Sequence, residues 1–281
     1  MITGTRYQLQ LEVNRQLRLS TEIARAQAEI STGKRILAAS DDPVGAARIS
    51  EIGRNQANQE TWRTNLDTAV ALSATADDVL TAVGIAIDRA NELMLRASNG
   101  TMSADNRNAI ALELSSIAEE VAVLRDTRDS RGEPLFPTST ALRIPVGAGL
   151  DISAVGTRAA VFDTIAIPSG SSDLVSILAG AAAAVRANDP AAIATALGAT
   201  NAAGSHIISA RGEQGARGSR IDTLLDRLED TALGLKEQRS AIESTDVMDA
   251  VARIQAKELS LEAAQAVFAR INRSSLFDLL S

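Results

Sequence analysis

Residues 76–97 read ADDVLTAVGIAIDRANELMLRA, and this stretch decides the class of fold. Its apolar positions alternate steps of four and three along one column: Ala76, Leu80, Val83, Ile87, Ala90, Met94 and Ala97. That spacing places the column on one face of an α-helix, as in the seam of a coiled coil. The stretch therefore predicts a long helix that packs against other helices.

The same kind of column recurs along the chain. Alternating steps of four and three run through Ile110, Leu114, Ile117, Val121 and Leu124, and again through Ile221, Leu225, Leu228, Ala232, Leu235 and Ile242. Steps of seven open the chain at Ile2, Leu9, Gln16, Ile23, Ile30 and Leu37, and close it at Val247, Ile254, Leu261 and Phe268. The spacing leaves two interpretations open: the end helices pack on each other within a monomer, or they stack between subunits.

The composition agrees with a helical protein. The chain has 281 residues, of which 45% are hydrophobic and only 2% aromatic, while 51 are alanine. A core with so few large rings is built from alanine and branched aliphatic side chains, which suits closely packed helices. The formal net charge of −7 argues against nucleic acid as a partner.

Catalytic and membrane signals are sparse. The sequence contains no cysteine and a single histidine, His206, which excludes disulfides, thiol nucleophiles and multi-histidine metal centres. We therefore expect no enzyme activity, no cofactor and no metal. The most apolar stretch, residues 178–199, is interrupted by Arg186, Asp189 and Pro190, so we expect no membrane insertion, and the first residues lack the apolar run of a cleaved signal peptide.

Helix boundaries are marked by capping residues. Asp42 precedes Pro43, a pair that suits an N-cap followed by the first helical position, where no amide donor is needed. Asn99-Gly100 predicts a helix stop, and Ser103 predicts the next N-cap. Ser244-Thr245-Asp246 shifts the phase between the last two columns, which predicts a break there.

A small β insert interrupts the helices. Leu142, Ile144 and Val146 alternate with polar or proline residues before a turn at residues 147–149, which predicts a β-hairpin. We expect a further short strand from Val161, Phe162, Ile165 and Ile167. An alanine-rich helical segment should follow from residue 173 to about 204, broken at residues 188–190.

Three features could be taken for functional chemistry, and a structural interpretation is favoured for each. Asp41 and Asp42 form a carboxylate pair, but no histidine or third carboxylate lies near them in sequence, so we interpret them as a loop acid and a helix cap. Residues 211–220, RGEQGARGSR, are basic and glycine-rich without a phosphate-loop spacing, which favours a helix. His206 stands beside apolar residues, which favours a packed or surface side chain.

Several motifs resemble one protein family. ISTGKRIL at residues 30–37, SDDPV at 40–44 and AAR at 46–48 resemble the N-terminal signature of the flagellar hook–filament junction proteins, the hook-associated protein 3 family. Residues 65–69, 211–217 and 261–271 resemble further helices of that family, and SLFDLL at 275–280 resembles its closing residues. Flagellin is a near relative, but its first signature and its ending usually differ from those found here.

The resemblance implies a structural role in the bacterial flagellum. Subunits would be secreted through the flagellar type III export channel with the help of a cytoplasmic export chaperone. They would then form a ring of their own copies between hook-associated protein 1 and the first layer of flagellin. A flagellin filament subunit, and a monomeric helical binding module, remain alternatives. A hidden enzyme or metal-binding protein would be revealed by stoichiometric metal or nucleotide in the purified chain.

The expected fold is mainly α, an elongated antiparallel helical bundle or coiled coil from both termini with a small β-hairpin insert. We divide it into an N-terminal assembly helix and loop (1–42), two halves of a helical rod (43–131 and 171–243), the insert (132–170) and a C-terminal assembly helix (244–281). Family members commonly carry an outer β domain where this chain has only residues 137–140, so that domain is reduced or absent. The expected assembly interface comprises Ile2, Leu9, Ile23, Ile30, Val247, Ile254, Leu261, Phe268 and Ile271.

Overall fold

The computed structural model describes residues 2–277; the side chains of residues 2–6, 8, 9 and 271–277 are outside the description. The chain divides into two compact units. The terminal unit comprises residues 1–57 and 232–281, and the central unit comprises residues 58–231. Helices α2 and α5 each contribute residues to both units.

The described part of the chain is mainly α-helical, as predicted. Its α-helices are α1 (Ile2–Thr32), α2 (Pro43–Ala97), α3 (Ala104–Arg125), α4 (Leu174–Ala187), α5 (Pro190–Glu243) and α6 (Val247–Phe277). The predicted breaks at residues 99–100, 188–190 and 244–246 are confirmed, since each coincides with a boundary between two helices; Pro190 is the first residue of α5. The predicted Ser103 cap is confirmed too, because its side chain accepts a hydrogen bond from the Asn106 amide.

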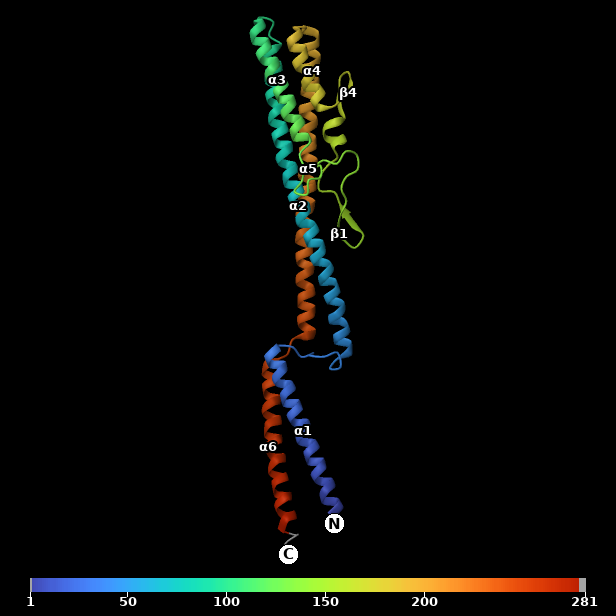
Figure 1. Cartoon of the computed structure of the whole chain (residues 1–281), viewed down its shortest axis with the longest axis vertical. Helices are drawn as coiled ribbons and strands as arrows, with labels where there is room; N and C mark the ends of the chain where they lie inside the picture. Colours follow the sequence, from blue (N-terminus) through green and yellow to red (C-terminus); the bar gives the residue numbers. More distant parts are fainter. Residues whose placement is uncertain (1, 278–281) are drawn as a thin grey trace. The chain divides into compact units, whose positions relative to one another are not determined.

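In the terminal unit, α1 and α6 lie side by side and run in opposite directions (Figure 1). The segments next to them pair through the backbone: Arg35 N–H donates to Glu243 O at 2.7 Å, and Thr245 N–H donates to Gly33 O at 3.1 Å. Gly33 has a φ of +67°, a left-handed conformation that suits glycine at the end of a helix. The loop pairing therefore begins directly where α1 stops.

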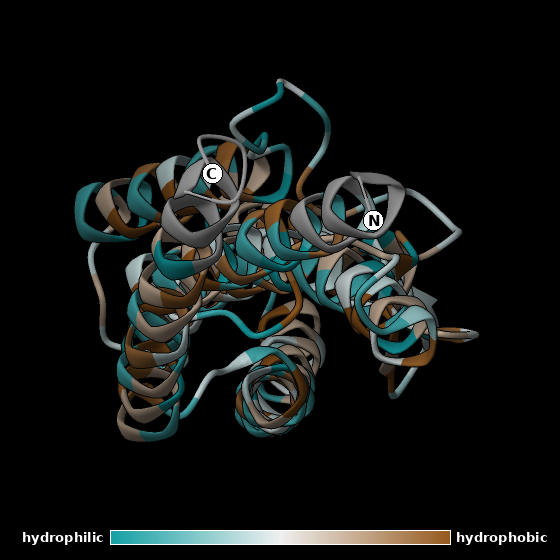
Figure 2. Ribbon diagram, turned by 90° about the horizontal axis from the view of Figure 1, so that it is seen from below, coloured by the Kyte–Doolittle hydropathy of each residue, from teal (hydrophilic) through white to brown (hydrophobic). Residues whose placement is uncertain are grey.

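In the central unit, parts of α2 and α5 pack with α3 and α4 around one apolar core (Figure 1). The apolar column from Ala76 to Ala97 of α2 lies in this core, and every one of its seven residues is buried. The helices alternate apolar and polar residues around their circumference (Figure 2), which is the pattern expected when one face of each is buried. Small alanine side chains on α3 and α4 contribute to the same core, among them Ala111, Ala118, Ala181 and Ala182.

The β insert consists of two hairpins. Strands β1 (Ile144–Gly147) and β2 (Leu150–Ile152) pair antiparallel, which confirms the predicted hairpin. Strands β3 (Ile165–Ile167) and β4 (Gly170–Ser172) form a second antiparallel pair. The prediction of a strand at Val161 and Phe162 is wrong, because both lie in η1, one turn of π-helix over Ala159–Asp163. Phe162 is buried there and meets Phe136 edge-on at 5.0 Å between ring centroids.

Two interpretations made from the sequence, for residues 211–220 and for His206, can be compared with the structure of the central unit. Residues 211–220 are helical within α5, and no phosphate loop is formed. His206 packs against η1, where its Nε2 lies 3.0 Å from Ala160 O and 3.2 Å from Val161 O. Among the described helices, α2 is the one long and apolar enough by composition to cross a membrane, and 44% of the apolar window is buried inside the protein. Core helices also pass that test.

Candidate assembly surface

The paired helices α1 and α6 carry the residues that the sequence singled out for assembly. Ile23 and Ala26 of α1 are buried, as are Ala250 and Ala264 of α6. Ile254, Leu261 and Phe268 stand at steps of three, four or seven from each other and from those two alanines, so helical periodicity places them in the same column. All three are half-buried, which leaves part of each side chain accessible.

The other predicted interface residues differ in their surroundings. Ile30 of α1 is half-buried, and Val247 at the start of α6 is exposed. The side chains of Ile2, Leu9 and Ile271 are outside the described residues. The two-helix pair therefore covers its seam incompletely.

A second set of apolar residues lies on faces that the seven-step columns do not mark. Leu17 of α1 is 61% exposed, and Met248 and Leu259 of α6 are 79% and 69% exposed. Met248 and Leu259 are eleven residues apart, about three helical turns, so they share one face of α6. The seven-step columns do not predict these residues, because each column marks a single face of its helix. Their apolar character at a common helical angle was the signal available.

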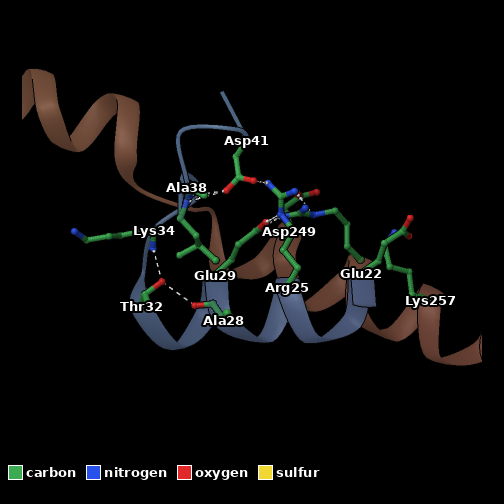
Figure 3. A network of polar contacts seen from close by, with 12 residues as sticks. Glu22, Arg25, Ala28, Glu29, Thr32, Lys34, Ala38, Asp41, Asp249 and Lys257 are labelled. Carbon is green, nitrogen blue, oxygen red and sulfur yellow. Dashed lines mark hydrogen bonds and ion pairs between the residues drawn. The ribbon is translucent and has the colours of Figure 1, made fainter. Parts of the chain in front are cut away.

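Polar contacts fix the pairing of α1 with α6 (Figure 3). The Glu29 carboxylate, only 5% exposed, receives the Arg253 guanidinium at 2.9 Å and the Arg25 guanidinium at 3.4 Å. Arg253 also contacts Asp249 at 3.0 Å, and Arg25 also contacts Asp41 at 3.0 Å. Glu29 is thus a nearly buried charge with a partner on each side, which a charge in that position requires.

Further along the helix pair, Glu22 of α1 pairs with Lys257 of α6. The hydrogen bond from the Lys257 ammonium holds the pKa of the Glu22 carboxyl below its ordinary value. Glu22 and Glu29 are seven residues apart on α1, whereas Lys257 and Arg253 are four apart on α6. In the antiparallel pairing Glu29 meets Arg253 and Glu22 meets Lys257, so the two ion pairs favour this alignment of the helices.

The loop between α1 and α2 is held by two aspartates with different partners. The Asp41 carboxylate accepts hydrogen bonds from the Ala38 amide at 2.9 Å and the Leu37 amide at 3.1 Å. The Ala38 bond, with smaller contributions from the Leu37 bond and Arg25, lowers the pKa of Asp41. Asp42 instead accepts from the Gly45 amide at 2.8 Å, in the first turn of α2. Its oxygen occupies the position that an N-cap side chain takes.

A third group of charges joins the loop after α1 to the end of α5. Lys34 and Arg239 both pair with the Glu243 carboxylate, and Arg239 does so at 2.8 Å. Hydrogen bonds from Arg239 and Lys34 hold the pKa of Glu243 below its ordinary value. Arg35 adds a hydrogen bond to Ile242 O at 3.2 Å. Side chains and backbone therefore tie the same two segments together.

The charged residues of α1, α6 and the loop after α1 line a cleft. It has a volume of about 360 Å³ and is lined by acids and bases together, among them Glu22, Glu29, Asp41, Arg35 and Arg253. Its carboxylates are occupied by neighbouring cationic side chains or backbone amides. Across the described residues, no group of three or more histidine, cysteine, aspartate or glutamate side chains has a geometry that could hold a metal ion. The arrangement is suited to holding helices together.

Comparison with known families gives the context for this surface. The bacterial flagellin N-terminal helical region matches residues 6–140, and the bacterial flagellin C-terminal helical region matches residues 197–280. Together the two regions cover well over half of the chain. The chain belongs to the flagellin family. It is therefore a helical component of the bacterial flagellum, with the two halves of the family signature at its two ends.

Two kinds of flagellar protein, hook-associated protein 3 and flagellin, are similar to this chain along most of its length. Flagellar hook-associated protein 3 of Escherichia coli K12 is 26% identical over 287 residues, covering 89% of this chain and 90% of the relative. The same protein of Salmonella typhimurium is also 26% identical, again over 89% of this chain and 90% of the relative. A flagellin of Listeria innocua is 24% identical over 85% of each chain.

Solved structures share the fold. A putative flagellar hook-associated protein from Vibrio parahaemolyticus superposes with a TM-score of 0.66 at 16% identity, covering 73% of this chain and all of that one. FlgL of Xanthomonas campestris gives a TM-score of 0.61 at 16% identity, covering 67% of this chain and 99% of that one. The relatives named by these comparisons are structural components of the flagellum.

Proposed function

We propose that this chain is the subunit of the junction ring between hook-associated protein 1 and the flagellin filament, assembled from copies of itself. The observation that carries the proposal is the distribution of apolar side chains on α1 and α6. A two-helix pair accounts for one buried face per helix, yet Leu17, Met248 and Leu259 stand exposed on other faces. Met248 and Leu259 share one face of α6, and large exposed apolar side chains on a common face are typical of a surface that binds another protein.

The half-buried seam supports the same role. Ile254, Leu261 and Phe268 of α6 retain accessible surface in the isolated chain, although they share a column with buried alanines. In a tube of paired helices, neighbouring copies would cover both this remaining surface and the outer faces. Export before assembly, with an export chaperone covering the chain's apolar surface in the cytoplasm, belongs to the same proposal.

A flagellin filament subunit is the second candidate, because a flagellin is similar over 85% of this chain. The sequence favours the junction role through ISTGKRIL at residues 30–37 and SLFDLL at residues 275–280, which resemble the hook-associated signatures. The structural relatives named above include hook-associated proteins. The two candidates differ in what a cell loses when the chain is removed.

Deletion of the coding gene separates them. For a junction subunit, electron micrographs should show hooks without filaments, and intact flagellin should accumulate in the medium. For a flagellin, the major flagellin band should disappear from the medium together with the filament. Retention of normal filaments after deletion would contradict both roles.

Complementation tests whether the outer face of α6 takes part. Leu259→Asp places a charge on a surface that is exposed in the isolated chain, so the purified variant should keep wild-type circular dichroism and melting. In the assembled ring that charge would lose its water, which is costly without a partner, so filaments should not form. Leu259→Met keeps the face apolar and is the matched control, with filaments expected. Normal filaments from Leu259→Asp would remove Leu259 from the assembly surface.

A further inference from the structure

The connection between α2 and α3 contains a sequence that lies outside the proposed assembly surface. Among the asparagines of the chain, Asn99 is the one followed by glycine. Asn99, Gly100 and Thr101 are all exposed, and they lie in the turn after the last residue of α2, Ala97. Because glycine has no side chain, its backbone nitrogen is open to approach by the preceding side chain.

The local contacts place three reacting parts together. Asn99 is anchored by its own amide, which donates to Arg96 O at 3.1 Å, while the Gly100 amide donates to no acceptor among the described residues. The Thr101 hydroxyl donates to the side-chain carbonyl oxygen of Asn99, Oδ1, at 3.2 Å. A donor on that oxygen stabilises the negative charge that develops when the carbonyl carbon is attacked.

We propose that Asn99 is a site of self-modification by deamidation through a cyclic imide. The Gly100 nitrogen gives its proton to hydroxide and bonds to Cγ of Asn99. The Cγ–Nδ2 bond then breaks, and ammonia leaves with a proton from water. Water next adds to one of the two imide carbonyls, which opens the ring to aspartate or to isoaspartate. The overall reaction consumes one water, releases one ammonia and needs no oxidant or reductant.

The product changes this end of the central unit. A carboxylate at residue 99 stands just past the C-terminus of α2, where the helix dipole disfavours negative charge. Isoaspartate also lengthens the backbone by one carbon between the Asn99 and Gly100 nitrogens, close to the Ser103 cap of α3. Since the reaction is irreversible, its extent in a population of subunits records the time since they were made.

Asn188 supplies an internal control. It is also exposed and follows a helix, α4, but the next residue is Asp189, whose side chain and charge hinder the approach of its nitrogen. The whole chain would be incubated in mildly alkaline buffer and mapped by peptide mass spectrometry with isoaspartate methyltransferase labelling. Conversion at residue 99 should exceed that at residue 188 several-fold, should rise with hydroxide concentration and should give both aspartate and isoaspartate.

Variants test the role of each part. Gly100→Ala crowds the nucleophile and should slow conversion several-fold. Thr101→Val removes the donor and should also slow it, whereas Thr101→Ser keeps the hydroxyl and should preserve the rate. Equal conversion at residues 99 and 188, or formation of aspartate without isoaspartate, would overturn the imide site. A Thr101→Val rate equal to that of the wild type would overturn the part assigned to the hydroxyl.

Discussion

The central and terminal units hold their helices together by different means. In the central unit, long aliphatic and alanine side chains from α2, α3, α4 and α5 form one continuous buried cluster. In the described part of the terminal unit, few apolar side chains are buried, and charged pairs such as Glu29–Arg253 and Glu22–Lys257 join α1 to α6. Burial of apolar surface stabilises the folded state strongly but does not depend on the direction of approach. Exposed ion pairs add little stability, but they favour one arrangement of the two helices.

The difference indicates a division of labour. A unit that is stable by itself needs a large internal apolar cluster, which the central unit has, although Ile85, Val123 and Ile208 are exposed on it. A unit that is completed by neighbours needs its register set in advance while its apolar surface remains available. The terminal unit meets both conditions, since its charges align α1 with α6 while Leu17 and Leu259 stay exposed.

Replacing a core leucine should have the largest effect. Leu114 of α3 is fully buried in the central unit, so Leu114→Ala should lower the free energy of unfolding by about 2–5 kcal/mol. Leu259→Ala, at an exposed position of the terminal unit, should change it by no more than about 0.5 kcal/mol. Urea unfolding of both variants, followed by circular dichroism, measures the two values. Similar losses would mean that the two units do not differ in the way described.

Substitution of Gln214 tests whether the stability of the central unit also depends on buried side-chain hydrogen bonds. Its side-chain amide is buried and donates to Ser73 Oγ and to Ala154 O, each at 2.9 Å. Gln214→Leu keeps the volume but leaves those acceptors without a donor, which should cost about 1–3 kcal/mol in unfolding free energy. Ser73→Ala removes a single acceptor and should cost less. A Gln214→Leu protein as stable as the wild type would show that apolar packing alone holds this contact.

Asp42 extends the comparison to the loop of the terminal unit. Asp42→Ala removes the acceptor for the Gly45 amide and should lower stability by about 0.5–2 kcal/mol, measured as a shift in the thermal transition. Calcium or magnesium should leave the wild-type transition unchanged, because the carboxylate serves a helix end. A metal-dependent shift that disappears in Asp42→Ala would identify a cation site instead.

Acid should affect the terminal unit before it affects the apolar core of the central unit. The central unit also has carboxyls with lowered pKa values, Glu92, Asp126, Asp129 and Asp173, but it is held in addition by its buried apolar cluster. The folded pKa values of Glu22, Asp41 and Glu243 lie below their unfolded values, so their contribution is present above about pH 4 and is lost as the pH falls through the folded pKa values. Hydrogen exchange in mild acid, corrected for intrinsic rates, should show reduced protection in α1 and α6 while the buried part of α3 keeps its protection. Uniform loss across both units would contradict the distinction.

Periodicity predicted the parts of the fold that repeat. The column from Ala76 to Ala97 is long and regular, so it identified both a helix and its buried face. The hairpin at β1 and β2 followed from alternation over a few residues. Strand β4 was missed because Gly170, Ser171 and Ser172 have little β-propensity and are paired through their backbone. Val161 and Phe162 are apolar enough for a strand, but packing around Phe136 places them in a helical turn.

The candidate surface was predicted less completely than the fold. A single sequence cannot reveal that Glu29 meets Arg253, because the two residues are 224 positions apart and each has many possible partners. The half-buried state of Leu261 likewise depends on how far α1 covers it. Family resemblance pointed to the end helices as the place of assembly, whereas the exposed residues on their outer faces came from the structure.

The backbone pairing of Gly33 and Arg35 with Thr245 and Glu243 has a consequence for how the terminal helices can vary among sequences. The donors and acceptors are main-chain atoms that every residue other than proline provides, so substitution of side chains other than at Gly33, whose φ of +67° favours glycine, leaves this junction in place. Lys34 faces Ser244 there in an antiparallel bridge. Substitutions along α1 and α6 can therefore accumulate, and side-chain contacts between the two helices can be replaced one turn at a time. The main-chain pairing meanwhile keeps the end of α1 beside the start of α6.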